Sequence, residues 1–125
     1  AIRALKRFVN DWERDHGLVV GTNDADMLAA VQKVIAMQGG LAVARNGAIL
    51  ETLPLSIAGL MSPLPIKRVD EKLTRLEQII AGLGSSEEHP FMSLAFLALS
   101  VIPALKLTDK GLVDVTRFCF VPIQD

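Results

Sequence analysis

The chain has 125 residues and few of the residue types that mark common functional classes. Its single cysteine, Cys119, excludes an internal disulfide and fits a reducing cytoplasm. Aromatic residues make up 5% of the chain, and the formal net charge is −1, with acids and bases interspersed. We therefore expect no nucleic-acid binding, because that function needs a basic groove with aromatic stacking platforms.

The sequence also lacks the patterns of a membrane span or a leader peptide. Its longest apolar stretch, Leu94–Leu105, is interrupted by Ser100 and Pro103 and is too short to cross a bilayer. The amphipathic N-terminal segment has no continuous apolar core of the signal-peptide kind. We expect no membrane contact and a cytoplasmic location.

Metal-binding and catalytic motifs are missing as well. The two histidines, His16 and His89, lie far apart, and the sequence has no His-x-His pair, HExxH, CxxC, GxSxG or phosphate-binding glycine loop. A metal-dependent hydrolase needs several ligands that converge on one open site. We therefore predict no metal site, no cofactor and no catalytic residues within the chain, and an inactive isolated chain.

His16 is the one residue that we single out as a candidate ligand contact. It precedes a predicted strand, and the acids Glu13 and Asp15 are close to it in sequence. Two interpretations remain open. His16 is either a surface histidine at a strand edge, or a histidine at a strand end that faces a cleft and is oriented by a carboxylate. We predict no role for His89, which lies in a polar loop.

Cys119 lies between Phe118 and Phe120 in a predicted strand. A catalytic thiol would need a nearby base, and no histidine is close to it in sequence. We therefore predict that Cys119 is a small buried or half-buried hydrophobic residue.

Helical periodicity occurs in three segments, and short apolar or β-branched runs occur in six. The predicted helices lie between Ile2 and Trp12, between Asp24 and Gly39, and between Ile66 and Gly82. The predicted strands are Leu18–Thr22, Leu41–Arg45, Ala48–Leu53, Ser93–Leu99, Leu112–Val115 and Arg117–Val121, with a turn at Leu107–Gly111. The order α-β-α-β-β-α-β-β-β indicates an α+β fold, a mixed α/β sandwich, in a single domain over residues 1–125.

Local signals fix two of these boundaries. Asn46-Gly47 lies between two strand-like runs and predicts a hairpin, because both turn positions need positive φ. Thr22, Asn23 and Asp24 are candidate N-caps of the second helix.

Half of the residues are apolar, which is high for a small domain. The nearly all-apolar runs Leu53–Met61 and Leu94–Leu105 contribute much of this content. We expect part of this surface to be covered, by self-association or by another domain.

Four blocks of the chain resemble the C-terminal region of bacterial adenine deaminases, in the order that the family has them. The blocks are LVVGTNDADM (Leu18–Met27), GGLAVARNGAILETLPLSIAGLMS (Gly39–Ser62), PFMSLAFLALSVIPALKLTDKGLVDV (Pro90–Val115) and RFCFVPI (Arg117–Ile123). Together they cover most of the chain from Leu18 onward.

This resemblance implies a function for the complete enzyme. The family belongs to the amidohydrolase superfamily, and its members hydrolyse adenine to hypoxanthine and ammonia with a metal-activated water. The resemblance implies a divalent transition metal, manganese or iron, whose ligands lie on a (β/α)8 barrel that precedes this region. It implies that this domain packs against such a barrel and helps to shape the purine site.

Residues 1–17 diverge from the family. Members carry a His-Asp-Ser-His-Asn pattern where this chain has Glu13-Arg14-Asp15-His16-Gly17, so that His16 alone keeps a histidine of the pattern. The resemblance thus favours His16 as the residue that would touch a purine. The alternative to an adenine deaminase domain is a non-catalytic binding or oligomerisation module derived from it.

Overall fold

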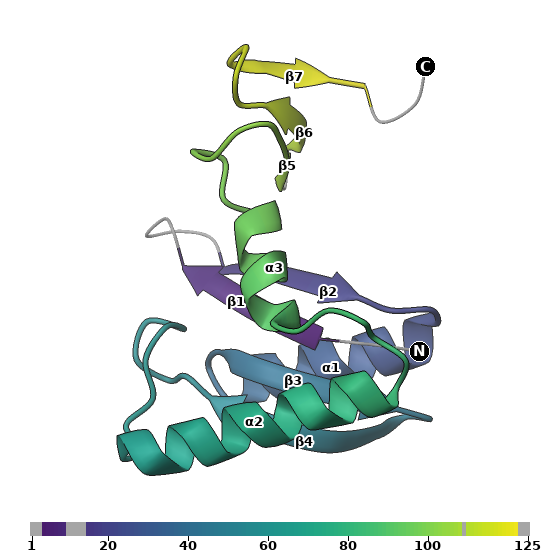
Figure 1. The fold of residues 1–125 in the computed structure, drawn as a ribbon, viewed down its shortest axis with the longest axis vertical. Coiled ribbons are helices and arrows are strands. Elements are labelled where there is room, and N and C mark those ends of the chain that lie inside the picture. The colour runs from purple at the N-terminus through teal and green to yellow at the C-terminus, as the bar shows by residue number, and fades with distance from the viewer. Residues whose placement is uncertain (1–3, 10–14, 109, 123–125) are drawn as a thin grey trace. The chain divides into compact units, whose positions relative to one another are not determined.

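The computed structural model describes residues 4–9, 15–108 and 110–122. The chain divides into two compact units, Ala1–Pro90 and Phe91–Asp125 (Figure 1). The single domain over residues 1–125 stays a prediction.

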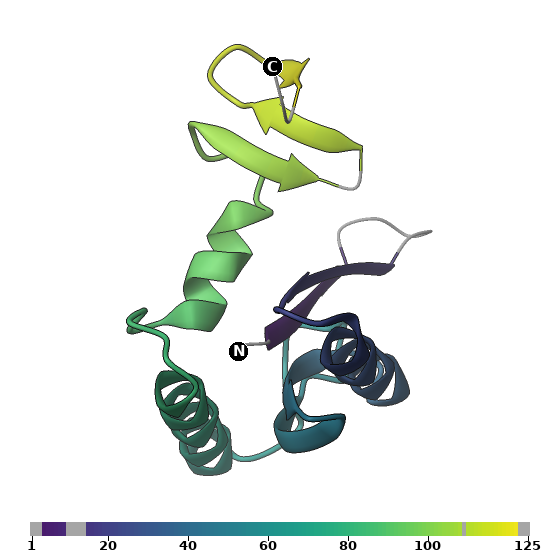
Figure 2. The same ribbon diagram turned by 90° about the vertical axis from the view of Figure 1, so that its right-hand side faces the viewer.

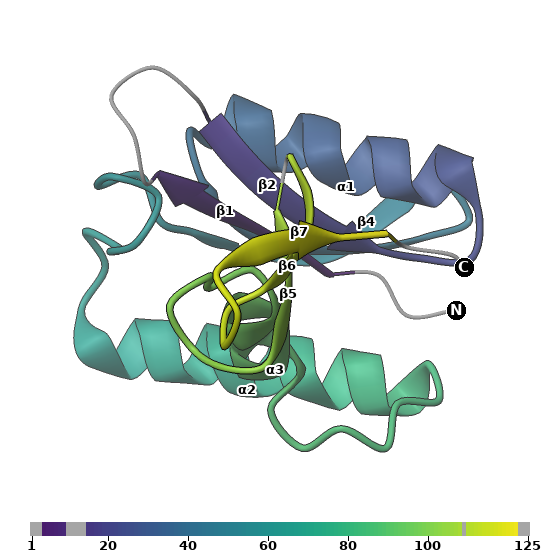
Figure 3. The ribbon, with the colours of Figure 1, turned by 90° about the horizontal axis from the view of Figure 1, so that it is seen from above.

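The N-terminal unit is built on a four-stranded antiparallel sheet. Its elements are β1 (Ala4–Val9), β2 (Asp15–Val20), α1 (Asp24–Ala36), β3 (Gly40–Arg45), β4 (Ala48–Pro54) and α2 (Ile66–Gly82). The strand order is β2-β1-β3-β4, so β1 and β3 are central. Figure 3 shows α1 and α2 on opposite sides of this sheet.

Small side chains form the core between α1 and β3. Ala30 and Val34 of α1 are buried together with Ala42 and Ala44 of β3. Alanine on the strand lets the helix approach the sheet closely. The predicted helix is confirmed, and Asn23 is its N-cap, with a side chain that accepts a hydrogen bond of 3.1 Å from the backbone N–H of Asp26.

The second face of β3 is buried as well. Leu41 and Val43 alternate with the alanines of the α1 face and are buried on the opposite face. Helix α2 packs against β4 and β3, and its Leu76 and Ile80 are fully buried. The sheet thus forms the middle layer between two helices, and the predicted third helix is confirmed.

The predicted hairpin is confirmed between β3 and β4. Arg45 pairs with Ala48, and the two turn residues Asn46 and Gly47 have φ values of 54° and 74°. Positive φ at both positions is what a two-residue turn of this kind requires.

The C-terminal unit contains one helix and a small antiparallel meander. Its elements are α3 (Pro90–Leu97), β5 (Leu105–Thr108), β6 (Gly111–Asp114) and β7 (Cys119–Val121), and Figure 2 shows the three strands in the order β5-β6-β7. The last two predicted strands are confirmed: β6 is shifted by one residue from the predicted Leu112–Val115, and β7 is two residues shorter than the predicted Arg117–Val121. The predicted turn is shorter than expected because Leu107 and Thr108 belong to β5.

Two predicted elements are wrong. The segment Ile2–Trp12 was expected to be helical, but the structure places strand β1 within it. A helix of this length is marginal in water without tertiary support. As a central strand, β1 instead gains ladder hydrogen bonds to β2 on one edge and to β3 on the other.

The second error concerns Ser93–Leu99, which was predicted as a strand and lies largely in helix α3. A short run that is apolar throughout does not distinguish a buried strand from a buried helix by periodicity. Composition favours a helix here: Ser93–Leu99 contains three leucines and two alanines, and Pro90 occupies the first helical position, where proline is favoured.

The described part of the chain contains three helices and two antiparallel sheets, which confirms the α+β class. The element order within it is β-β-α-β-β-α-α-β-β-β. None of these helices combines the length and the apolar character that a membrane crossing requires.

Candidate functional site

A metal site needs several His, Cys, Asp or Glu side chains that converge on one point. Among the side chains that the structure describes, no three of His, Cys, Asp or Glu come close enough to hold a metal ion. These residues therefore do not fit the divalent metal that the resemblance implies.

His16 lies in β2, where its backbone pairs with that of Phe8. Asp15 is the first residue of the same strand, and Glu13 lies outside the described residues. The side chains of Asp15 and His16 are also outside the described part of the chain. The contact expected of His16 stays a prediction.

His89 and Cys119, for which the sequence predicts no functional role, lie on exposed surface. His89 has its Nδ1 atom 3.3 Å from Oε1 of Glu77 on α2, and both ends of this pair reach solvent. Cys119 is exposed, so its predicted burial is wrong. It lies in β7, an edge strand of the three-stranded sheet, where the flanking Phe118 and Phe120 are exposed too.

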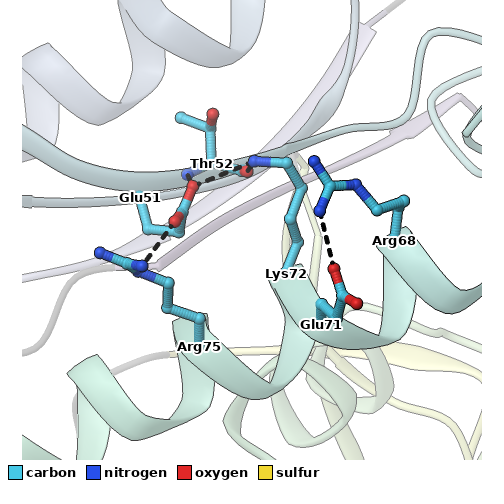
Figure 4. A network of polar contacts seen from close by, with 6 residues as sticks. All are labelled: Glu51, Thr52, Arg68, Glu71, Lys72 and Arg75. Atoms are coloured by element: carbon cyan, nitrogen blue, oxygen red, sulfur yellow. Dashed lines mark hydrogen bonds and ion pairs between the residues drawn. The ribbon is translucent and has the colours of Figure 1, made fainter.

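A polar network joins β4 to α2 (Figure 4). Glu51 Oε1 accepts hydrogen bonds from the backbone N–H of Thr52 at 2.8 Å and from Lys72 Nζ at 3.2 Å. Its Oε2 lies 3.2 Å from Arg75 Nε. Lys72 also donates to the backbone oxygen of Thr52 at 3.1 Å. One carboxylate therefore connects the strand to two successive turns of the helix.

The environment of Glu51 favours its ionised form. The hydrogen bond from the Thr52 backbone lowers the pKa of Glu51 most, and the hydrogen bond and charge of Lys72 and the charge of Arg75 lower it further. Partial burial opposes these effects, but the net pKa lies below the usual value for glutamate. An ionised carboxylate that is already paired with two cations is poorly suited to accept a proton in catalysis.

Asp26 forms a second long-range link. Its side chain is buried, and its Oδ1 accepts a hydrogen bond from the backbone N–H of Gly47 in the β3–β4 turn. The first turn of α1 is thereby tied to the tip of the hairpin. No local sequence pattern predicts this link, because Gly47 is 21 residues from Asp26 along the chain.

Lys106 on β5 is the other buried charged residue among those described. Its Nζ donates to the backbone oxygen atoms of Leu105 at 3.1 Å and of Pro103 at 3.4 Å. This lysine fixes the chain that enters β5. No sequence motif marks it.

The contacts of these three polar groups stabilise the fold. Glu51, Asp26 and Lys106 each bind backbone groups or neighbouring side chains of their own unit. A catalytic constellation would need a nucleophile or activated water, a base and a group that orients the base. The expected absence of catalytic residues from the chain stays a prediction.

The chain is similar to a known domain family and to part of several longer proteins. Residues 12–119 match the family described as the adenine deaminase C-terminal domain. The chain is 57% identical over 106 residues to an adenine deaminase of Desulfatibacillum aliphaticivorans, which covers 85% of this chain and 19% of that protein. It is 53% identical over 111 residues to adenine deaminase 2 of Carboxydothermus hydrogenoformans, which covers 87% of this chain and 20% of that protein.

A relative from Brucella anthropi, also named adenine deaminase, is 50% identical over 103 residues. That match covers 82% of this chain and 18% of the relative. The chain thus spans about a fifth of the length of the curated relatives that it matches. The family match covers most of the chain, and so the chain belongs to the adenine deaminase C-terminal domain family.

Proposed function

We propose that this chain serves as the C-terminal domain of a metal-dependent adenine deaminase, which converts adenine and water to hypoxanthine and ammonia in the cytoplasm. The observation that carries the proposal is the identity of 57% over 85% of the chain with a protein named adenine deaminase. The chain corresponds to 19% of that protein, so the chemistry belongs to a larger assembly.

The metal would be held outside the residues described here, since they contain no group of three ligands. The resemblance favours manganese or iron, with ligands on a (β/α)8 barrel. The role of the present domain is to pack against that barrel and to shape the purine site. His16 is the residue that we propose to contact the purine.

The alternative is a binding or oligomerisation module that has lost catalysis. One observation favours it. Helix α3 is apolar over nearly its whole length, and Met92, Phe96 and Leu97 on it are exposed. An apolar surface of this kind marks contact with another protein surface, including a second copy of the chain.

Two measurements on purified protein test the first function. The 125-residue chain should contain no stoichiometric transition metal and should release no ammonia from adenine. The complete polypeptide that carries the domain should contain the metal and should release ammonia from adenine. Removal of its metal by a chelator should abolish ammonia release. A complete polypeptide that binds metal but leaves adenine intact would favour the alternative, and tightly bound metal with turnover in the isolated chain would contradict both.

A further inference from the structure

Exposed apolar side chains are concentrated in the connection between β4 and α2. We call the exposed residues Ile57, Leu60, Met61, Leu64 and Ile66 the 57–66 surface. Ile66 is 84% exposed although it opens helix α2. No charged residue occurs between Leu53 and Ile66. Charge is therefore absent from the whole segment, as it is from the longer run Pro90–Leu105 of the C-terminal unit.

The segment is held in one conformation by its own backbone. Ile57 and Met61 exchange two hydrogen bonds, each of 3.1 Å, and Ile57 also accepts one from Leu60. Ala58 and Gly59 between them have φ values of 54° and 70°, which gives a tight turn. The turn presents its apolar side chains to solvent.

The turn is also fixed to the body of the unit. The backbone N–H of Leu55 donates to the oxygen of Gly39 at 3.1 Å. Gly39 lies so close to Gly59 that an added Cβ would meet the Gly59 Cα at 2.7 Å. A preformed surface loses little conformational freedom when it binds, which is a property of interface segments.

We propose that the 57–66 surface is the face on which the remainder of the adenine deaminase polypeptide packs. This inference rests on the proposed function. It identifies which part of the domain contacts the rest of the polypeptide. Two arguments select this occupant. About four fifths of the matched relative's length lies outside the region that this chain covers. The segment also has no charge, and the cores of permanent interfaces are apolar and depleted of charge.

The structure supplies a matched pair of positions for a test. Met61 on the 57–66 surface is 58% exposed, and Leu28 on the outer side of α1 is 57% exposed. The variants Met61→Cys and Leu28→Cys would be made in the complete polypeptide in a Cys119→Ser background, since Cys119 is itself exposed. Alkylation by a maleimide would be followed by mass spectrometry of the peptide that carries each new cysteine. The alkylation rate of each folded variant would be divided by the alkylation rate of the same variant in denaturant, which gives a relative rate.

Because buried thiols react only when the interface opens, the relative rate at Met61→Cys should be on the order of tenfold lower than at Leu28→Cys. Equal relative rates at the two positions would overturn the proposal. Protection of Met61→Cys that disappears when the enzyme is diluted to monomers would also overturn it, because the occupant would then be a second copy. Ammonia release from adenine is measured on the same samples. Protection of Met61→Cys without ammonia release would support the interface and contradict the proposed function. Ammonia release without protection would support the proposed function and contradict the interface.

Discussion

Glu51 illustrates how a single side chain joins two elements of the N-terminal unit. Its carboxylate is 17% exposed and binds Lys72 and Arg75 of α2 while it also accepts the Thr52 backbone N–H. Arg75 is 70% exposed, so solvent screens its share of the interaction. The hydrogen bonds to the less exposed groups should therefore carry most of the stabilisation.

We predict that Glu51→Gln lowers the free energy of unfolding by about 1–2 kcal/mol at neutral pH, because it removes charge-assisted hydrogen bonds from a largely buried group. Urea denaturation followed by circular dichroism would measure the loss. The control is Glu71→Gln, whose exposed pair with Arg68 should contribute no more than about 0.5 kcal/mol.

The same variant has a defined pH dependence. The pKa of Glu51 is lowered in the folded state, so its stabilisation is present above the unfolded-state pKa and is lost as the pH falls through the lowered folded-state pKa. The difference between wild type and Glu51→Gln should therefore shrink from neutral pH to about pH 3. A difference that stays constant over this range would show that the ionised carboxylate is not its source.

The residues that fix this unit were not predictable from the sequence. Glu51 lies 21 residues from Lys72, and Asp26 lies 21 residues from Gly47. Neither pair has a helical or strand spacing, and only the sheet and the two helices bring the partners together. By contrast, the N-cap Asn23 and the Asn46-Gly47 turn act within a few residues and were predicted correctly.

Prediction at the scale of elements succeeded where a local pattern and the tertiary environment agree. Helices α1 and α2 have one apolar face each, and that face is buried. Strand β5 was missed in part because a turn was predicted from Leu107, whereas the errors at β1 and α3 arise where the pattern is compatible with two structures. β1 is set by pairing with β2 and β3, and α3 is an apolar run that shows no period.

The turn from α1 into β3 supplies a test at this scale. Gly40 has φ of 140°, and an added Cβ would lie 2.3 Å from the backbone oxygen of Leu53. We predict that Gly40→Ala lowers the free energy of unfolding by about 3 kcal/mol or more, since strain and steric overlap act together. Thermal unfolding followed by circular dichroism would measure the change.

Gly82 gives the matched control, because it lies in helix α2 and an added Cβ would meet no atom within 4 Å. Gly82→Ala should raise the stability by about 0.5–1 kcal/mol through helix propensity. If both substitutions had the same sign, the close approach of Gly40 to β4 would not be a determinant of the fold.

At the scale of the whole molecule, the composition and the family match both indicate that another part of a longer protein covers this domain. Half of the residues are apolar, and several large apolar side chains remain exposed, among them those of the 57–66 surface. Such a domain would gain stability from a covering partner, and the matched relatives are about five times as long as the region that this chain covers. The fold class followed from patterning, whereas the function followed from resemblance, because no catalytic motif is present in the sequence.

The proposed role of His16 can be tested only in the complete enzyme. A histidine beside the purine site would exchange hydrogen bonds with the ring nitrogens or the amino group of adenine near neutral pH. We predict that His16→Ala lowers kcat/KM for adenine by about tenfold, which corresponds to one lost hydrogen bond in a closed site, and leaves the thermal unfolding of the domain unchanged. Steady-state ammonia release as a function of adenine concentration would separate an effect on KM from one on kcat.

His89→Ala is the matched control, because His89 is exposed and paired with Glu77, and it should leave both constants unchanged. If the two variants behaved alike, with the barrel and its metal intact, His16 would be a strand residue without a part in the reaction.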